Sequence, residues 1–185
     1  MDPGANSYRC FLEGDDKGME EIVGAYKDGL ILYLNGFVNN IYTAEELTED
    51  TFFRLMTKRP KFTGKSSFKT FLYAVGRNLT IDYIRHYSRF PETPIEDREM
   101  YLSDMSDLEN SYIMEERKVW VHRALEQLMP DYRQIIWLSF FEDLPNKEIS
   151  MIMKKNERQI RNLIYRAKQA LKSELGKEGF VYEEF

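Results

Sequence analysis

The chain has 185 residues, 43% of them hydrophobic, and a formal net charge of -5, which suits one ordinary domain or two small ones and excludes disorder throughout. Cys10 is the single cysteine, which excludes a disulfide framework or a multi-cysteine zinc site within one chain. No apolar run approaches the roughly 20 residues of a membrane span, and the acidic N-terminus lacks a signal-peptide pattern, so we expect a soluble cytoplasmic protein with no direct membrane insertion.

Charge is distributed unevenly along the chain. Residues 54–90 carry nine Lys/Arg and one Asp, residues 91–117 carry nine Asp/Glu and two Arg, and residues 147–177 carry nine Lys/Arg and three Glu. Lys and Arg side chains placed at phosphates release counterions and so drive nucleic-acid binding. The layout predicts two modules that contact DNA, joined by a connector that DNA repels.

Apolar residues at helical spacing predict three helices in the first half of the chain. Thr43 is the expected N-cap of the second helix, and Glu46 three residues later completes a capping box. Pro60 and Gly64 interrupt the pattern, so the segment KRPKFTGKS is predicted to be a loop. The expected helices span residues 19–41, residues 43–56 and residues 67–87.

The second half of the chain is also predicted to be helical. A helix is expected from about residue 112 to 128, another begins at Pro130, and a short one begins at Pro145. Asn156 is the expected N-cap of the last helix, with Gln159 at the N3 position. No stretch alternates like a strand, so the fold class is all-α with two small helical domains. The predicted division is an N-terminal extension 1–18, a first domain 19–90, an acidic linker 91–111, a second domain 112–176 and a tail 177–185.

The last two predicted helices, with the tight turn of residues 154–156 between them, form a helix-turn-helix pattern. Arg and Asn side chains read base edges bidentately in the major groove, and the second helix carries both on its outward face. A helical hairpin with a solvated basic face is the alternative. The outward face comprises Glu157, Arg158, Arg161, Asn162, Tyr165, Lys168 and Lys172, with Lys147, Lys154 and Lys155 placed to meet phosphates.

Two blocks of the sequence resemble a known family. Residues 124–173, with LMPDYRQIIWL, KEIS and RNLIYRAKQAL, resemble the promoter-reading C-terminal domain of bacterial sigma factors. AEELTEDTFFRLM and KFTGKSSFKTFLYAVGRNLTIDYIR resemble the N-terminal domain of the same proteins. The short linker is similar to that of the extracytoplasmic-function (ECF) sigma factors of the sigma-70 family. The resemblance implies a bacterial protein, not an enzyme and without a cofactor, that binds core RNA polymerase and directs promoter-specific transcription initiation.

The basic segment of the first domain combines cations with aromatic side chains, a pairing that suits single-stranded DNA. The resemblance implies that this loop and the start of the following helix capture an unpaired base of the −10 element. The alternative for Phe68 and Phe71 is a place in the core, which we favour for Phe71. The residues assigned to the melted strand are Phe62, Ser66, Ser67, Phe68, Lys69, Arg77, Asn78 and Arg85.

An acidic helix precedes that loop. Its carboxylates could form a metal or acid–base pair or a merely solvated face, but we favour a protein-docking face. The resemblance implies that this helix grips a coiled coil of the β′ subunit of RNA polymerase, with a further contact to the β flap. The residues assigned to polymerase are Glu45, Glu46, Leu47, Glu49, Asp50 and Phe53.

The resemblance further implies that the last helix reads the duplex −35 element and that an anti-sigma factor, often linked to the membrane, is a partner. The acidic linker is either an RNA mimic in the polymerase cleft or a connector that charge keeps away from DNA, and both interpretations stay open. The residues assigned to the −35 element are Lys147, Lys155, Arg158, Arg161, Asn162, Tyr165 and Arg166.

Two other classes of function fit the sequence less well. A stand-alone helix-turn-helix regulator would not need the aromatic and cationic loop, and an α-helical enzyme would need a nucleophile–base or metal-ligand set that the sequence lacks. Asp82 and His86 are four residues apart, but a salt bridge or an exposed histidine is favoured over a metal pair. Cys10 lies outside the two segments that resemble the family. The acidic tail FVYEEF either docks on a basic face or is disordered. We therefore predict no metal site.

Overall fold

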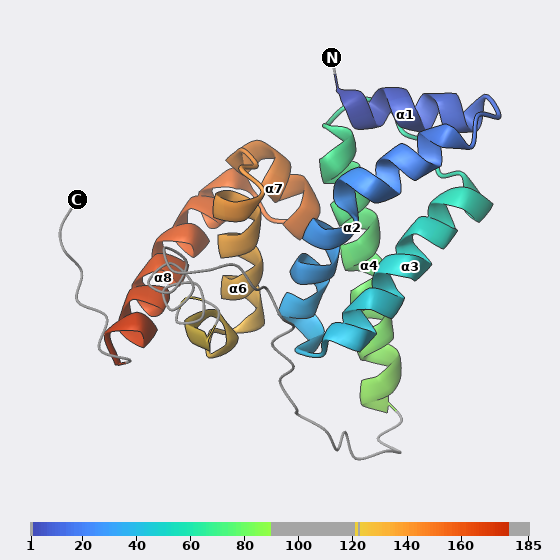
Figure 1. Cartoon of the computed structure of the whole chain (residues 1–185). Coiled ribbons are helices and arrows are strands. Elements are labelled where there is room, and N and C mark those ends of the chain that lie inside the picture. The colour runs from blue at the N-terminus through green and yellow to red at the C-terminus, as the bar shows by residue number, and fades with distance from the viewer. Residues whose placement is uncertain (1, 90–120, 122, 178–185) are drawn as a thin grey trace, which may run out of the picture.

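The computed structural model describes residues 2–89, 121 and 123–177, and Figure 1 shows the path of the chain. Within those ranges the regular elements are all helical, as the sequence predicts. They are α1 (Pro3–Leu12), α2 (Lys17–Val38), α3 (Ile41–Lys58), α4 (Phe68–Arg89), α6 (Pro130–Ile136), the π-helical segment η1 (Trp137–Phe141), α7 (Asn146–Met153) and α8 (Glu157–Lys177).

Helices α2, α3 and α4 pack side by side in the first domain, and α1 lies across one end of them (Figure 1). Each long helix turns one apolar stripe inward, because residues three and four apart share a face. Leu34 of α2, Leu55 of α3 and Leu72 of α4 are each fully buried. This core fixes the orientation of the opposite, polar faces of α3 and α4.

Helix α1 lies in residues 1–18, where the sequence predicts only an extension. The Asp2 side chain caps it and Pro3 opens it, a position at which proline costs no hydrogen bond. Tyr8 is 1% exposed and belongs to the core of the first domain. A Cβ on Gly18 would lie 2.2 Å from the backbone oxygen of Ser7, so only glycine lets α2 approach α1 this closely.

The predicted capping box at Thr43 is wrong. Helix α3 begins at Ile41, and the Asn40 side chain accepts the Thr43 N–H at 3.0 Å. Asn39 adopts a left-handed conformation, with φ of 51°, and ends α2 at Val38. Asn and Thr are both good N-caps. Because the left-handed Asn39 turns the chain just before Asn40, Asn40 is the N-cap. Ile41 therefore belongs to α3 instead of α2.

The second domain contains the predicted helix-turn-helix. Lys154 ends α7 in a left-handed conformation, with φ of 53°. The Asn156 side chain then accepts the Gln159 N–H, and the Gln159 side chain accepts the Asn156 N–H, each at 2.9 Å. The predicted N-cap of the last helix is confirmed. Pro145 is the N-cap of α7 instead of its first residue, and the π-helical turn of η1 has no counterpart in the prediction.

The acidic linker 91–111 and the FVYEEF tail lie outside the described residues, and the domain boundaries remain predictions. No helix in the described ranges is long and apolar enough to span a membrane.

Candidate nucleic-acid interface

Helix α1 holds the loop that the sequence assigns to the melted strand. The Tyr8 hydroxyl donates a hydrogen bond to the Pro60 backbone oxygen at 2.8 Å, and the Arg59 guanidinium lies 5.1 Å from the centre of the Phe11 ring. Burial raises the pKa of Tyr8, which keeps the hydroxyl protonated as the donor. The start of the loop is therefore fixed by a helix that lies outside the predicted first domain, 19–90.

Asp2 fixes the other end of the same loop. One oxygen of its carboxylate accepts the Ala5 N–H at 3.2 Å, and the other accepts the Phe68 N–H at 2.5 Å. The first N–H groups of a helix have no partner within the helix, and a carboxylate also interacts favourably with the helix dipole. Asp2 thus caps α1 and α4 together. This contact joins residues 66 apart, and no local pattern signals it.

The aromatic residues around the loop form one cluster. Phe68 is 0% exposed and packs against Tyr8, Tyr26, Phe62 and Phe71. The Phe68 ring is therefore a core group and is not available to stack on a base. Phe71, which the sequence places in the core, is partly buried against it, and Phe62 is half-buried in the same cluster.

The polar residues assigned to the melted strand lie at the start of α4 and along one of its faces. Ser67 accepts the Thr70 N–H at 3.2 Å, and the Ser66 hydroxyl donates to the Ser67 backbone oxygen at 3.2 Å. Lys69, Arg77 and Asn78 all contact the second domain. Arg85 stands apart near the end of α4, where it is exposed and lies 3.9 Å from Asp82.

Helix α8 presents the residues assigned to the −35 element. Ile160 and Ala167 are buried on its inner face. The assigned residues of α8 are exposed on the other side, and Tyr165 is 66% exposed. Lys147 is exposed on α7, whereas Lys155 is half-buried and pairs with Asp131 at 3.4 Å. A shallow hollow beside the turn is lined by Lys155, Gln159, Asn162, Leu163 and Arg166.

Helix α3 lies on the side of its bundle away from α6 and α8 (Figure 1). Its four assigned carboxylates are exposed, and so is Phe53, at 60%. Leu47 is 4% exposed and packs inward, so it supports this face from below. Tyr42, also on α3, is 64% exposed. An anionic surface with exposed aromatic rings suits a protein partner. The carboxylates of the face are Glu45, Glu46, Glu49 and Asp50.

No group of three or more His, Cys, Asp or Glu residues within the described ranges is arranged to hold a metal ion. Asp82 lies near Arg85, and the His86 ring contacts Tyr87. Cys10 is a free, half-buried cysteine on α1.

The strong pKa shifts belong to tyrosines. Burial, reinforced by the nearby Glu142 carboxylate, raises the pKa of Tyr73.

Two small helical domains, the second with a basic helix-turn-helix, define a two-part DNA-binding protein. The family model for Sigma-70 region 2 matches residues 22–90, and the model for Sigma-70, region 4 matches residues 118–171. The chain belongs to the sigma-70 family, as an ECF RNA polymerase sigma factor.

Relatives and solved structures agree with this family. The chain is 25% identical over 166 residues to the RNA polymerase sigma-H factor of Pseudomonas aeruginosa, covering 85% of this chain and 86% of that protein. It is 26% identical over 171 residues to the ECF RNA polymerase sigma factor SigW of Bacillus subtilis, covering 88% and 91%.

Two solved structures share the fold. The sigma factor RpoE of Bartonella quintana, solved with the anti-sigma factor NepR, matches with a TM-score of 0.69 and 20% identity, covering 86% of this chain and 98% of that chain. CnrH, solved with the cytosolic domain of CnrY, matches with a TM-score of 0.63 and 17% identity, covering 95% and 96%.

Proposed function

We propose that this protein binds core RNA polymerase and directs promoter-specific transcription initiation, with one DNA task for each domain. The observation that carries this proposal is the division of α8 into a buried apolar face and an exposed face bearing Arg161, Asn162, Tyr165 and Arg166. The turn before α8 has the geometry of a helix-turn-helix, which places such a face in a major groove. Arg161 and Asn162 are the groups suited to read base edges of the −35 duplex.

The first domain holds the melted −10 strand in this proposal. Phe62, at the edge of the aromatic cluster, and Asn78 on α4 are the groups placed to meet an unpaired base, while Lys69, Arg77 and Arg85 suit phosphates. Extruding a base costs a few kcal/mol, and stacking on an aromatic ring returns about 1–3 kcal/mol. Opening the promoter in this way needs no catalytic residue and no cofactor.

Core polymerase docks on the acidic face of α3. Four exposed carboxylates beside Phe53 suit a basic partner surface, for which we propose the β′ coiled coil, and the second domain meets the β flap. Charge complementarity speeds such an encounter and sets its orientation, and a central aromatic side chain commonly dominates the binding energy.

An anti-sigma factor is a further expected partner. The sigma factor RpoE and CnrH, which share this fold, were each solved as a complex, the first with an anti-sigma factor and the second with the cytosolic domain of CnrY. No described residue of this chain identifies the surface that such a partner would cover.

In vitro transcription with core RNA polymerase of the same organism tests the proposed function. Adding the protein should produce transcripts that begin at particular genomic promoters, and sequencing their 5′ ends would define the elements. Asn78→Ala should weaken promoter opening while core binding survives, whereas the matched control Ser88→Ala, on the exposed end of α4, should change neither. Failure to stimulate transcription from any genomic promoter would contradict the proposal.

A further inference from the structure

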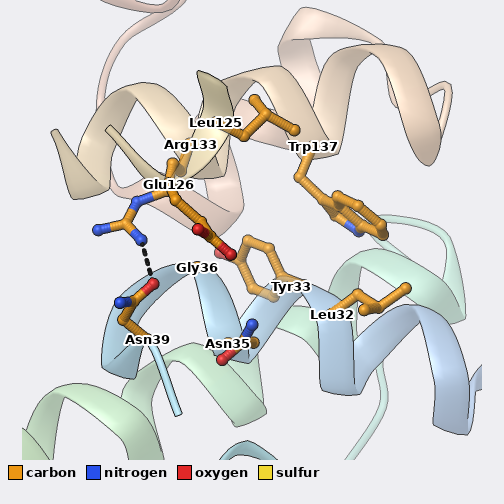
Figure 2. A pocket seen from close by; sticks show the side chains of 9 residues that line it. All are labelled: Leu32, Tyr33, Asn35, Gly36, Asn39, Leu125, Glu126, Arg133 and Trp137. Atoms are coloured by element: carbon orange, nitrogen blue, oxygen red, sulfur yellow. Dashed lines mark hydrogen bonds between the residues drawn. The ribbon is translucent and has the colours of Figure 1, made fainter. Parts of the chain in front are cut away.

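Exposed hydrophobic side chains gather on one part of the first domain. Isolated apolar residues are normal on a protein surface, but a cluster of them marks an interaction site. Five of the seven exposed large hydrophobic residues within residues 2–89 lie on α3 or on the last turns of α4. Of the other two, Leu12 lies on α1, and Leu32 lines a small pocket together with Trp137 of the second domain (Figure 2). The five are Tyr42, Phe53, Met56, Ile84 and Tyr87.

Helix α3 carries its exposed aromatic rings on the same face as its carboxylates. Each residue advances an α-helix by about 100°, so Tyr42, Glu49 and Phe53 fall within about 40° of one another. Tyr42 and Phe53 are separated by 11 positions in the sequence, which corresponds to about 16 Å along the helix axis. The acidic face therefore begins and ends with an exposed aromatic ring. The residues on either side of this line are Glu45, Glu46 and Met56.

The end of α4 lies beside the start of α3. Both are at the end of the first domain opposite α1 (Figure 1), and the two helices pack against each other. The ring centres of Tyr83 and Tyr87 are 4.4 Å apart, and Tyr87 is 58% exposed. Burial and the neighbouring Tyr87 raise the pKa of Tyr83, and an interaction with the Thr43 side chain of α3 opposes that rise. Tyr83 therefore connects the exposed Tyr87 ring to the first turn of α3.

The tyrosines of α4 do not lie on its proposed DNA face. Asn78 and Arg85 are seven residues apart and share one face of the helix. Tyr83 and Tyr87 are each two residues from Arg85, which places them about 160° around the helix from it. The tyrosines and the residues proposed to meet DNA are thus on nearly opposite sides of α4, and the tyrosine side continues into α3.

We propose that Tyr42 and Tyr87, with Tyr83 between the two helices, extend the acidic face of α3 into one docking surface for core RNA polymerase. This inference rests on the proposed function of α3. Specific interfaces commonly use about 20–30 residues on each side, more than one face of the 18-residue α3 supplies. The partner that fits is a basic surface with two apolar sites about 16 Å apart, one for Tyr42 and one for Phe53.

Competition for core polymerase tests this extension. Unlabelled variants displace the labelled full-length protein from core. Tyr42→Ala and Tyr87→Ala should each weaken core binding by about fivefold or more, the effect of losing an anchoring aromatic side chain, while Tyr42→Phe should keep most of the affinity. Leu12→Ala is the matched control, because Leu12 is also exposed, at 39%, but on α1 at the opposite end of the domain (Figure 1). Its core binding should not change.

Salt dependence separates the rings from the charges. Glu49→Gln removes one exposed carboxylate from the same face, so its loss of affinity should shrink between about 0.1 M and about 0.5 M salt, because salt screens exposed charges. Burial of an apolar ring is not screened. The loss caused by Tyr42→Ala should therefore persist over the same range.

Each outcome decides the inference. If Tyr42→Ala or Tyr87→Ala leaves core binding unchanged, the docking surface does not extend to the end of α4 and the inference is overturned. The same follows if Tyr87→Ala weakens binding of single-stranded promoter DNA to the assembled polymerase at unchanged core affinity, since the tyrosines would then serve nucleic acid. Neither result affects the proposed function, which fails only if the unaltered protein does not stimulate promoter-dependent transcription. Thermal unfolding of both variants should be unchanged, because both rings are exposed.

Discussion

Asp2 offers the sharpest test of how the first domain is held together. Asp2→Ala removes one carboxylate from two helix N-termini, those of α1 and α4. Loss of an N-cap costs about 0.5–2 kcal/mol, and a hydrogen bond to a charged group contributes about 1.5–3 kcal/mol. We therefore expect a loss of about 2–5 kcal/mol, a large share of the stability of a small domain.

Urea unfolding of the full chain, followed by circular dichroism, measures this loss, and hydrogen exchange locates it. Asp2→Asn keeps one side-chain oxygen as an acceptor, so it should cost about half as much. Asp16→Ala is the matched control, because Asp16 is the N-cap of α2 but makes no capping hydrogen bond with its side chain. Exchange should accelerate in residues 60–72 of the Asp2→Ala protein and stay unchanged in α8.

A loss below about 0.5 kcal/mol, the low end for an N-cap, would refute the double cap. Equal losses for Asp2→Ala and Asp16→Ala would also refute it. Removal of a negative charge near a helix N-terminus would then explain both losses without any capping hydrogen bond. Slower promoter opening with normal core binding should accompany the loss of stability, because the loop that Asp2 anchors is the one assigned to the melted strand.

Three further predictions concern the other surfaces. Arg161→Ala should weaken binding to a duplex carrying the −35 element by about 1–3 kcal/mol, measured by anisotropy, without changing core binding. Phe53→Ala should weaken binding to core polymerase by more than about 1 kcal/mol, measured by competition for core, at unchanged stability because the ring is 60% exposed. Burial and Glu142 hold the pKa of Tyr73 above its unfolded value; its contribution to stability is therefore complete below about pH 10 and is lost as the pH rises further. Tyr73→Phe should reduce that alkaline loss, measured by thermal unfolding from about pH 8 to 11.

The sequence predicts local structure well where one signal dominates. Asn156 and Gln159 cap each other as expected, because a capping box is formed by residues three apart. At the start of α3 two adequate caps compete, and the left-handed Asn39 decides in favour of Asn40. A single sequence gives no measure of that backbone reversal, so the prediction chose Thr43.

The candidate site was predicted less completely than the fold. The motif assigned Leu47 to polymerase and Phe68 to the melted strand, with a place in the core as the alternative for Phe68, and the structure buries both. Asp2 and Tyr8 were missed because their contacts, to Phe68 and Pro60, join residues 66 and 52 apart in the chain. Helical spacing relates residues three or four apart in the chain, so it does not predict contacts between residues this far apart in sequence.

The contacts that cover α4 show why charge layout alone could not assign this surface. Lys69, Ser67 and Asn78 can bind a phosphate or a base, but the same donors and acceptors bind the carboxylates of Glu142 and Glu148 and the amine of Lys154. Water can replace each of these hydrogen bonds when the domains separate, so the net cost of breaking one is about 0.5–1.5 kcal/mol, or more where a charge is involved. The positive charge of the first basic segment therefore does not by itself distinguish a surface that binds nucleic acid from one that packs against another part of the same chain.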